Sequence, residues 1–299
     1  MGISRAQEHI AASGALKIMS PGMRTAPRCA ICANEREYAF SARVLKHHTA
    51  DYWYCPACGL LQVHDPVWLA EAYGAPIAAA DTGLVQRNLW AAVRITSLVF
   101  LAFDRRARYL DVAGGYGLLT RLLRDAGLDF YWQDDHCPNL HAVGFEADLT
   151  ANCEPFAAIT AIEVLGHLMD PVEFLSRWRN LAKTTTIMFT TELFDDSPPH
   201  PAEWWYYSFE TGQHVSFYQR RTLKALADVL GLQLYSRGAL HIFTDKPINR
   251  LVLRICTGPS SLIISRIARH QLQSLTFQDH HRQLSAAAAP WRDEPDNGP

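Results

Sequence analysis

Four cysteines in two Cys-x-x-Cys pairs have the clearest chemical spacing in the sequence. Cys29 and Cys32 form the first pair, and Cys55 and Cys58 form the second after 22 intervening residues. Each pair can bind one ion from a tight turn, and four thiolates complete the tetrahedron that zinc prefers. A redox Cys-x-x-Cys usually stands alone before a helix, and incidental buried thiols rarely fall into two such pairs. We therefore expect a structural zinc ion.

A glycine-rich turn follows a strand-forming run in "YLDVAGGYGLLTRLLRDAG", residues 109–127. A dinucleotide site needs G-x-G-x-x-G, but Thr120 stands where the third glycine belongs, and no loop of the G-x-x-x-x-G-K-[ST] kind is present. Asp111 precedes the turn, where a carboxylate would repel a pyrophosphate but would suit a cationic amino-acid group. The turn therefore favours S-adenosylmethionine. The expected cofactor contacts are Asp111, Ala113, Gly114, Gly115, Gly117 and, for the ribose hydroxyls at the end of the next strand, Asp134.

Hydrophobic periodicity predicts the elements that must position this turn. Strands are expected at 109–113, 129–134, 157–162, 184–192, 232–236 and 240–244, and helices at 117–126, 171–182 and 221–230. This alternation is typical of an α/β fold with a doubly wound parallel sheet, and the last two strands fit an edge hairpin. Asp170, Pro171 and Glu173 have the types expected at the start of the 171–182 helix.

Two stretches resemble class I S-adenosylmethionine-dependent methyltransferases. "YLDVAGGYG" is similar to their first motif, with Ala113 in place of the first glycine. "ITAIEVLGHLMDPVEFL", residues 159–175, resembles the stretch after their fourth strand, with His167 kept and Gly166 replacing a glutamate. The resemblance covers about residues 105–245 and implies a seven-stranded, mostly parallel sheet with an antiparallel final strand. It also implies that residues around Glu163 face the cofactor and that residues 145–148 lie near the adenine.

A narrower resemblance concerns the acceptor. A four-cysteine module ahead of such a domain is similar to zinc-containing sugar C-methyltransferases, whose Tyr-x-Glu-His motif serves the active site. Here "ETGQHVSFY", residues 210–218, keeps His214 but has Gln213 and Thr211 in place of the glutamate and tyrosine. The resemblance implies His214 as a general base, with His167 as a second catalytic candidate, because a neutral imidazole can accept the acceptor's proton.

Two further stretches allow alternatives. The aromatic stretch "PHPAEWWYYSFETGQH", residues 199–214, either forms a lid that stacks on a sugar or base, or buries the sheet edge or contacts another subunit. The basic amphipathic segment 245–275 either lies on an anionic membrane surface or packs back on the domain or a second subunit. We favour packing, because Gly258 and Pro259 break the helical pattern.

Composition limits the class of protein. The 299 residues carry a net charge of -2, and residues 1–68 carry seven Lys/Arg against five Asp/Glu, so nucleic acid is a disfavoured partner. No secretory signal is evident, and the most apolar run, 89–103, contains Arg94 and is too short to span a bilayer. Seven cysteines without an export signal favour a soluble protein of the reducing cytoplasm. Assembly into a homo-oligomer is compatible with the sequence.

The expected organisation is a disordered extension at 1–25, a zinc-binding module at 26–65, a helical segment at 66–104 and a methyltransferase domain at 105–245. An amphipathic helical segment with a disordered tail follows at 246–299, and the tail is expected to be "SAAAAPWRDEPDNGP", residues 285–299. The favoured function is O- or C-methylation of a small molecule, a sugar or glycan precursor that is nucleotide-linked or lipid-linked. Two alternatives stay open: a ribosomal-RNA methyltransferase, and a degenerate scaffold without activity, because Ala113 and Gly166 depart from the family pattern. Thr120 and Asp111 contradict a nicotinamide-dependent oxidoreductase.

Overall fold

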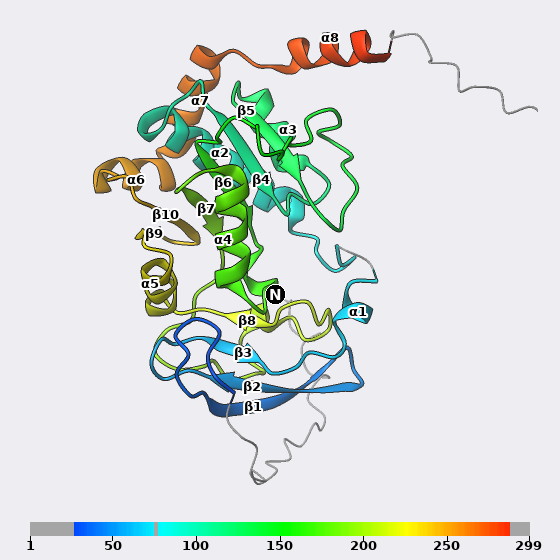
Figure 1. Ribbon diagram of the computed structural model, residues 1–299, viewed down its shortest axis with the longest axis vertical. Helices are drawn as coiled ribbons and strands as arrows, with labels where there is room; N and C mark the ends of the chain where they lie inside the picture. Colours follow the sequence, from blue (N-terminus) through cyan, green and yellow to red (C-terminus); the bar gives the residue numbers. More distant parts are fainter. Residues whose placement is uncertain (1–26, 75–76, 288–299) are drawn as a thin grey trace, which may run out of the picture.

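The chain forms two β-sheets, with helices packed around the larger one (Figure 1), in a computed structural model that describes residues 27–74 and 77–287. The expected extension at 1–25 and the expected tail from residue 288 onward lie outside the described residues. The small sheet lies at the lower end of the view in Figure 1, and the large sheet lies above it.

The small sheet carries the cysteine pairs and is completed by a strand from far along the chain. Strands β1 (Glu37–Val44), β2 (His48–Tyr54) and β3 (Leu61–Val63) pair in antiparallel order, and β8 (Ser216–Phe217) adds to β3. Its core holds the buried rings of Tyr52, Tyr207 and Phe217. The segment before His214 is therefore built into this sheet and does not hang free.

The large sheet confirms the expected α/β class. Its strands are β4 (Arg108–Val112), β5 (Asp129–Gln133), β6 (Ala158–Ile162), β7 (Ile187–Thr190), β9 (Gln233–Arg237) and β10 (Leu240–Thr244), in the order β5-β4-β6-β7-β10-β9. Strands β5, β4, β6 and β7 are parallel, whereas β10 is antiparallel to both of its neighbours. The expected antiparallel final strand is present.

The expected seventh strand is missing from the described part of the chain, where the sheet has six. Its place beside β5 is taken by one isolated parallel bridge between Trp132 and Glu146. Gly144 precedes the bridge with a φ of +83°, and the Asp148 carboxylate accepts the Thr150 N–H at 2.9 Å just after it. Turns on both sides therefore leave no length for a strand. This bridge places part of the 145–148 stretch next to the end of β5.

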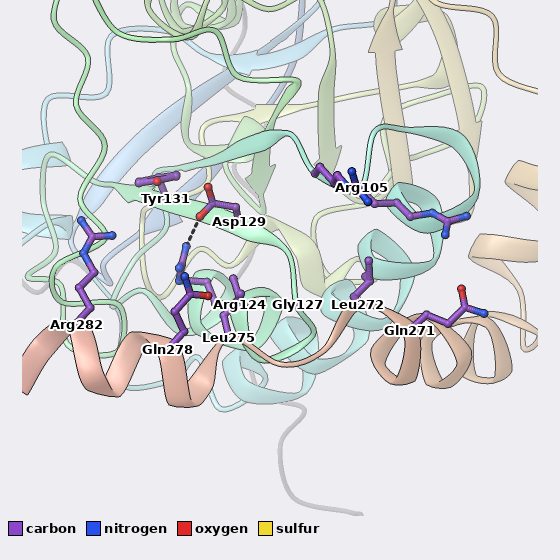
Figure 2. A pocket seen from close by; sticks show the side chains of 11 residues that line it. Arg105, Arg124, Gly127, Asp129, Tyr131, Gln271, Leu272, Leu275, Gln278 and Arg282 are labelled. Carbon is purple, nitrogen blue, oxygen red and sulfur yellow. Dashed lines mark hydrogen bonds and ion pairs between the residues drawn. The ribbon is translucent and has the colours of Figure 1, made fainter.

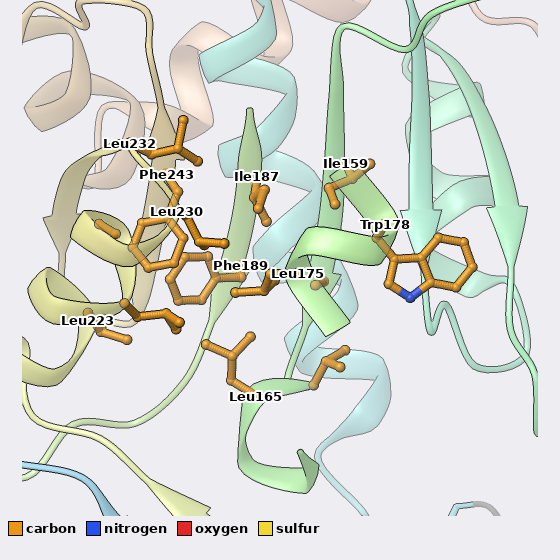
Figure 3. Close-up of a cluster of buried hydrophobic side chains, with 14 of the residues drawn as sticks. Ile159, Leu165, Leu175, Trp178, Ile187, Phe189, Leu223, Leu230, Leu232 and Phe243 are labelled. Atoms are coloured by element: carbon orange, nitrogen blue, oxygen red, sulfur yellow. The ribbon is translucent and has the colours of Figure 1, made fainter. Parts of the chain in front are cut away.

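Helices cover both faces of the large sheet. On one face, α4 (Pro171–Ala182) and α5 (Arg220–Val229) enclose the core shown in Figure 3, which includes Ile159, Leu175, Trp178, Phe189 and Phe243. The other face packs against α2 (Leu84–Ala102) and α3 (Leu118–Asp125). Helix α4 begins as expected, because Asp170 accepts the Glu173 N–H at 2.8 Å and Pro171 needs no partner there. The short helix α1 (Leu69–Ala72) follows β3 in the chain and lies beside the small sheet (Figure 1).

Three helices end the described chain: α6 (Arg250–Thr257), α7 (Ser261–Leu272) and α8 (Thr276–Ala287). Helices α6 and α7 pack on α2, where the Ser97 hydroxyl donates to the Ser261 carbonyl at 2.9 Å. Helix α8 and its link from α7 form one wall of a cavity of about 580 Å³ (Figure 2). Residues 285–287, expected to belong to the disordered tail, are instead the last residues of α8, because alanine favours helix.

No single helix among the described residues has the length and hydropathy to cross a membrane. Helices α6 and α7 pass that test only together, and they are bent by 91° at the break between them.

Candidate active site and cysteine cluster

The glycine turn between β4 and α3 is tight and lies at the carboxyl end of the parallel strands. Ala113, Gly115 and Gly117 have φ angles of +49°, +55° and +83°. An L-residue in this left-handed region costs about 1 kcal/mol, which is the strain at Ala113 that a glycine would avoid. The Gly114 N–H donates to the Gln133 carbonyl of β5 at 3.1 Å, so the turn is fastened to the neighbouring strand.

Asp111 supports the turn from beneath. Its side chain is buried and accepts hydrogen bonds from the hydroxyls of Thr160 at 2.6 Å and Thr120 at 3.2 Å. A Cβ on Gly114 would lie 2.8 Å from the Asp111 Oδ2, so glycine is required above it. Burial raises the pKa of Asp111 to about 7 against the effect of these two hydrogen bonds. Asp111 therefore supports the turn from a buried position and does not lie on an open surface. Thr120 donates a hydroxyl hydrogen bond to it, which a glycine at this position could not do.

Asp134 lies beside the turn, at the end of β5. Its Oδ2 accepts the Gly115 N–H at 2.8 Å, and its Oδ1 accepts the N–H groups of His136 and Cys137 at 2.7 Å each. A carboxylate has about four acceptor positions, so one remains after these three bonds. The structure thus brings Asp134 and Gly115 together, as the sequence predicts.

A second group of polar side chains meets after β6 and in the aromatic stretch. Glu163 follows β6 with a φ of +57°, and its N–H donates to the Thr190 hydroxyl at 2.9 Å. The Tyr206 hydroxyl donates to the Glu163 Oε2 at 3.0 Å. The Tyr206 carbonyl lies 2.7 Å from the Nδ1 of His214. A carbonyl only accepts, so Nδ1 carries the proton in the neutral ring and Nε2 holds the free lone pair.

His167 lies directly beside His214. The two rings are 4.9 Å apart in an edge-to-face arrangement, and the Nδ1 of His167 is 2.9 Å from the Tyr73 hydroxyl. Burial lowers the pKa of His214, and burial together with the neighbouring His214 lowers the pKa of His167 to about 3. Both imidazoles are therefore neutral at physiological pH.

The sequence did not identify Tyr73 or single out Tyr206. Tyr206 belongs to the aromatic stretch, where four consecutive aromatic residues gave no way to choose among them. In the structure they divide: Tyr207 is buried in the small sheet's core, Tyr206 faces Glu163 and His214, and Trp205 is 77 % exposed. Tyr73 stands in no motif, and no signal in the sequence marks it.

The four cysteines lie together at the edge of the small sheet. Their sulfur atoms are all within 4.8 Å of one another, and the pairs Cys29–Cys58 and Cys32–Cys55 are each 3.5 Å apart. A tetrahedron with zinc–sulfur bonds of about 2.3 Å has edges of about 3.8 Å, so the cluster fits such an ion. The hydrogen bond between Cys58 and Cys29 lowers the pKa of Cys29 and raises that of Cys58, so the two sulfurs share a proton that a metal ion would displace.

A family model described as a methyltransferase domain matches residues 86–237, half of the chain. The chain belongs to this methyltransferase-domain family. The match includes the glycine turn, Glu163, His167 and His214, but not the four cysteines. No curated protein matches the chain significantly.

Several solved structures of methyltransferases are similar to this chain. TnmH is 17 % identical, with a TM-score of 0.43, over 60 % of this chain and 60 % of its own. The magnesium protoporphyrin IX methyltransferase ChlM from Synechocystis PCC 6803, with bound SAH, is 13 % identical, with a TM-score of 0.40, over 58 % of this chain and 90 % of its own. An O-methyltransferase family 2 protein from Planctomyces limnophilus DSM 3776, in complex with apigenin, is 13 % identical, with a TM-score of 0.37, over 60 % and 66 %. This methyltransferase-domain protein thus spans about 60 % of the length of TnmH.

Proposed function

We propose that this protein transfers a methyl group from S-adenosylmethionine to a small-molecule acceptor, a sugar or glycan precursor, on oxygen or carbon. The observation that carries the proposal is the convergence of His214, Glu163 and Tyr206 after β6, the strand that lies beside β4 and its glycine turn. In an open α/β sheet, ligands bind at this carboxyl end of the strands.

The residues of the turn fit the cofactor. A Cβ on Gly117 would lie 2.6 Å from the Asn139 side chain, whereas a Cβ on Gly115 would lie 3.6 Å from Ile77, an ordinary contact distance. Asp134, with its remaining acceptor position, would accept one ribose hydroxyl, and the amino-acid end would lie against the half-buried turn. S-adenosylmethionine supplies a methyl group that already carries its leaving group. The turn's task is alignment, which can be worth about 7–11 kcal/mol in favourable cases.

On the acceptor side, His214 would accept the acceptor's proton at Nε2. The Tyr206 carbonyl holds Nδ1 and so aims Nε2 away from that bond. A positioned general base contributes about 10²–10⁴-fold. Glu163 is held by Tyr206 and would bind an acceptor hydroxyl. His167, fixed by the Tyr73 hydroxyl, would position His214 through their ring contact rather than take the proton, because its pKa of about 3 makes it a weak base.

The sugar class of the acceptor rests on one exposed ring. Trp205 is 77 % exposed in the same short 3-10 turn as Tyr206. An exposed indole next to polar groups that bind hydroxyls suits the stacking of a sugar ring. A nucleotide-linked or lipid-linked carrier is compatible with this arrangement.

We also propose that the cysteine cluster holds zinc in a structural role. Four protein thiolates leave no open coordination position for a substrate. Buried Arg36 lies near the cluster, where its positive charge offsets part of the negative charge of four thiolates. The ion would fasten the loops that precede β1 and β3 and so hold the small sheet together.

Calorimetric titration with S-adenosylmethionine, and with NADH in parallel, tests the cofactor. Gly115→Val should abolish S-adenosylmethionine binding. Gly238→Val is the matched control, because Gly238 has nearly the same φ, +56° against +55°, but has nothing within 4 Å of its Cβ position. Binding of S-adenosylmethionine alone, lost only in Gly115→Val, supports the proposal. Binding of neither ligand would favour a scaffold, and binding of NADH alone would refute our reading of the turn.

A further inference from the structure

A second group of metal-ligating side chains lies away from the cysteines, where the β1–β2 turn meets α1. It consists of His47, His48 and Glu71, whose ligand atoms lie within 4.8 Å of one another. The Nε2 atoms of His47 and His48 are 3.2 Å and 2.9 Å from the same carboxylate oxygen, Glu71 Oε2. Neither the proposed methyl transfer nor the cysteine cluster uses these residues.

The distances agree with a divalent metal. A tetrahedral ion with nitrogen and oxygen bonds of about 2.0–2.1 Å separates its ligand atoms by about 3.3–3.4 Å. The two observed nitrogen–oxygen distances fall within about half an ångström of that value, so small rotations of the side chains suffice. Two imidazoles and one carboxylate suit zinc and neighbouring divalent ions, and they leave coordination positions open to water.

The backbone holds the two imidazoles in place. Leu45 and Lys46 precede them with φ angles of +50° and +68°, a left-handed pair in a tight turn. The Leu45 N–H donates to the Phe209 carbonyl at 3.0 Å, and Arg43 donates to the Lys46 carbonyl at 2.9 Å. Consecutive residues in an extended strand point to opposite faces, whereas this turn brings the rings of His47 and His48 to 4.3 Å.

The site is connected to the candidate active site through α1. Glu71 is followed by Ala72, whose carbonyl accepts from the Gln213 amide at 2.9 Å, and by Tyr73, which bonds His167. Trp68, at the start of α1, donates to the Gly212 carbonyl at 2.9 Å. An ion on Glu71 would therefore fix α1 between the β1–β2 turn and the loop that leads to His214.

We propose that His47, His48 and Glu71 form a second zinc site, which holds α1, and through it Tyr73 and the loop before His214, in the arrangement seen here. The proposal is independent of the cysteine cluster and of methyl transfer. It concerns metal binding and local order, both of which are measured without an acceptor.

The test compares zinc and cobalt binding to the full chain with binding to two variants. Glu71→Gln keeps the size of the side chain but removes a ligand. Since even outer-sphere partners are worth about 10–100-fold in metal affinity, we expect this variant to bind the second ion at least about 100-fold more weakly. His280→Ala/His281→Ala is the control, because it removes another exposed pair of neighbouring histidines, on α8, which belongs to no cluster of three such ligands among the described residues.

The expected result is that wild type and the control bind one equivalent of metal more than Glu71→Gln. In the cobalt form this additional equivalent should lack the sulfur-to-metal absorption that the cysteines would give. Zinc should also slow hydrogen exchange of the Ala72 and Tyr73 amides in wild type but not in Glu71→Gln. The proposal is overturned if Glu71→Gln binds as many equivalents as wild type, or if the control loses the same equivalent. A failure of the cysteine site would lower all three proteins equally and leave the difference intact.

Discussion

The buried ion pair that holds α8 against the domain gives the most direct quantitative prediction. The guanidinium of Arg124 in α3 donates to both carboxylate oxygens of Asp279, at 2.9 Å and 2.8 Å, and both side chains are only 5 % exposed. Arg121 adds a third contact to Asp279 at 2.8 Å. Burial opposes ionisation of Asp279, but the hydrogen bonds and charges of the two arginines outweigh it and hold the pKa of its carboxyl below the ordinary value.

Asp279→Asn should lower the free energy of unfolding by about 2–3 kcal/mol. Removing one partner of a buried pair usually costs about 3–5 kcal/mol. The cost is lower here because Arg124 keeps Asp129 at 2.7 Å, the Phe130 carbonyl at 2.9 Å and the ring of Phe145 beneath it. Figure 2 shows the remaining Arg124–Asp129 pair close to Leu275 and Gln278 at the start of α8.

Thermal and urea denaturation of Asp279→Asn measure this effect, with an expected fall in Tm of roughly 3–5 °C. Asp228→Asn is the matched control, because it breaks an exposed pair with Lys224 that is worth about 0.5 kcal/mol or less. The difference between Asp279→Asn and wild type should vanish as the pH falls through this lowered pKa, because the wild-type carboxyl is then protonated as well. Equal Tm values for the two variants would refute the view that Asp279 balances a buried charge.

Three further predictions concern the site. His214→Asn keeps an N–H for the Tyr206 carbonyl but removes Nε2, so methyl transfer should fall about 10²–10⁴-fold while calorimetry shows unchanged S-adenosylmethionine affinity; an unchanged rate would exclude His214 as the base. Burial raises the pKa of Asp111 to about 7 in the fold, against about 3.9 in the unfolded chain, so the fold loses stability as the pH rises between these two values. Between pH 4 and pH 8 the free energy of unfolding of Asp111→Asn should therefore rise by up to about 4 kcal/mol relative to wild type in urea denaturation. A difference that does not depend on pH would contradict this. Cys55→Ser should lose one equivalent of bound metal and melt at a lower temperature, whereas Cys137→Ser, outside the cluster, should keep the metal; retention of zinc by Cys55→Ser in elemental analysis would argue against the cysteine site.

Local sequence determined most of the elements of the large sheet. The expected helix at 171–182 has the observed bounds, because its start depends on neighbouring residues, Asp170 and Pro171. The glycine turn was recognised for the same reason, since a positive φ at Gly115 and Gly117 is a property of the residue itself. The expected strand at 184–192 shortened to Ile187–Thr190, because sequence does not show where the paired neighbour ends.

The family resemblance predicts seven strands in the large sheet, one more than the described residues form. The bridge at Glu146 forms only two backbone hydrogen bonds with Trp132, from the Ala147 N–H and to the Phe145 carbonyl, each at 2.8–2.9 Å. A strand persists only where several successive residues pair, and the turns on either side prevent that here. A family pattern gives the order of strands, whereas the residues between Asp134 and Ala158 decide whether each position is filled.

The sequence by itself determined the types of residue available for chemistry: four paired cysteines, a glycine turn after Asp111, and histidines at 167 and 214. Only the tertiary structure decided which of them meet and which residues join them. Tyr73 contacts His167 from 94 positions away, and β8 brings the chain around His214 into the small sheet. Such contacts depend on how whole elements pack, and packing energy is shared among many side chains that carry no individual mark in the sequence.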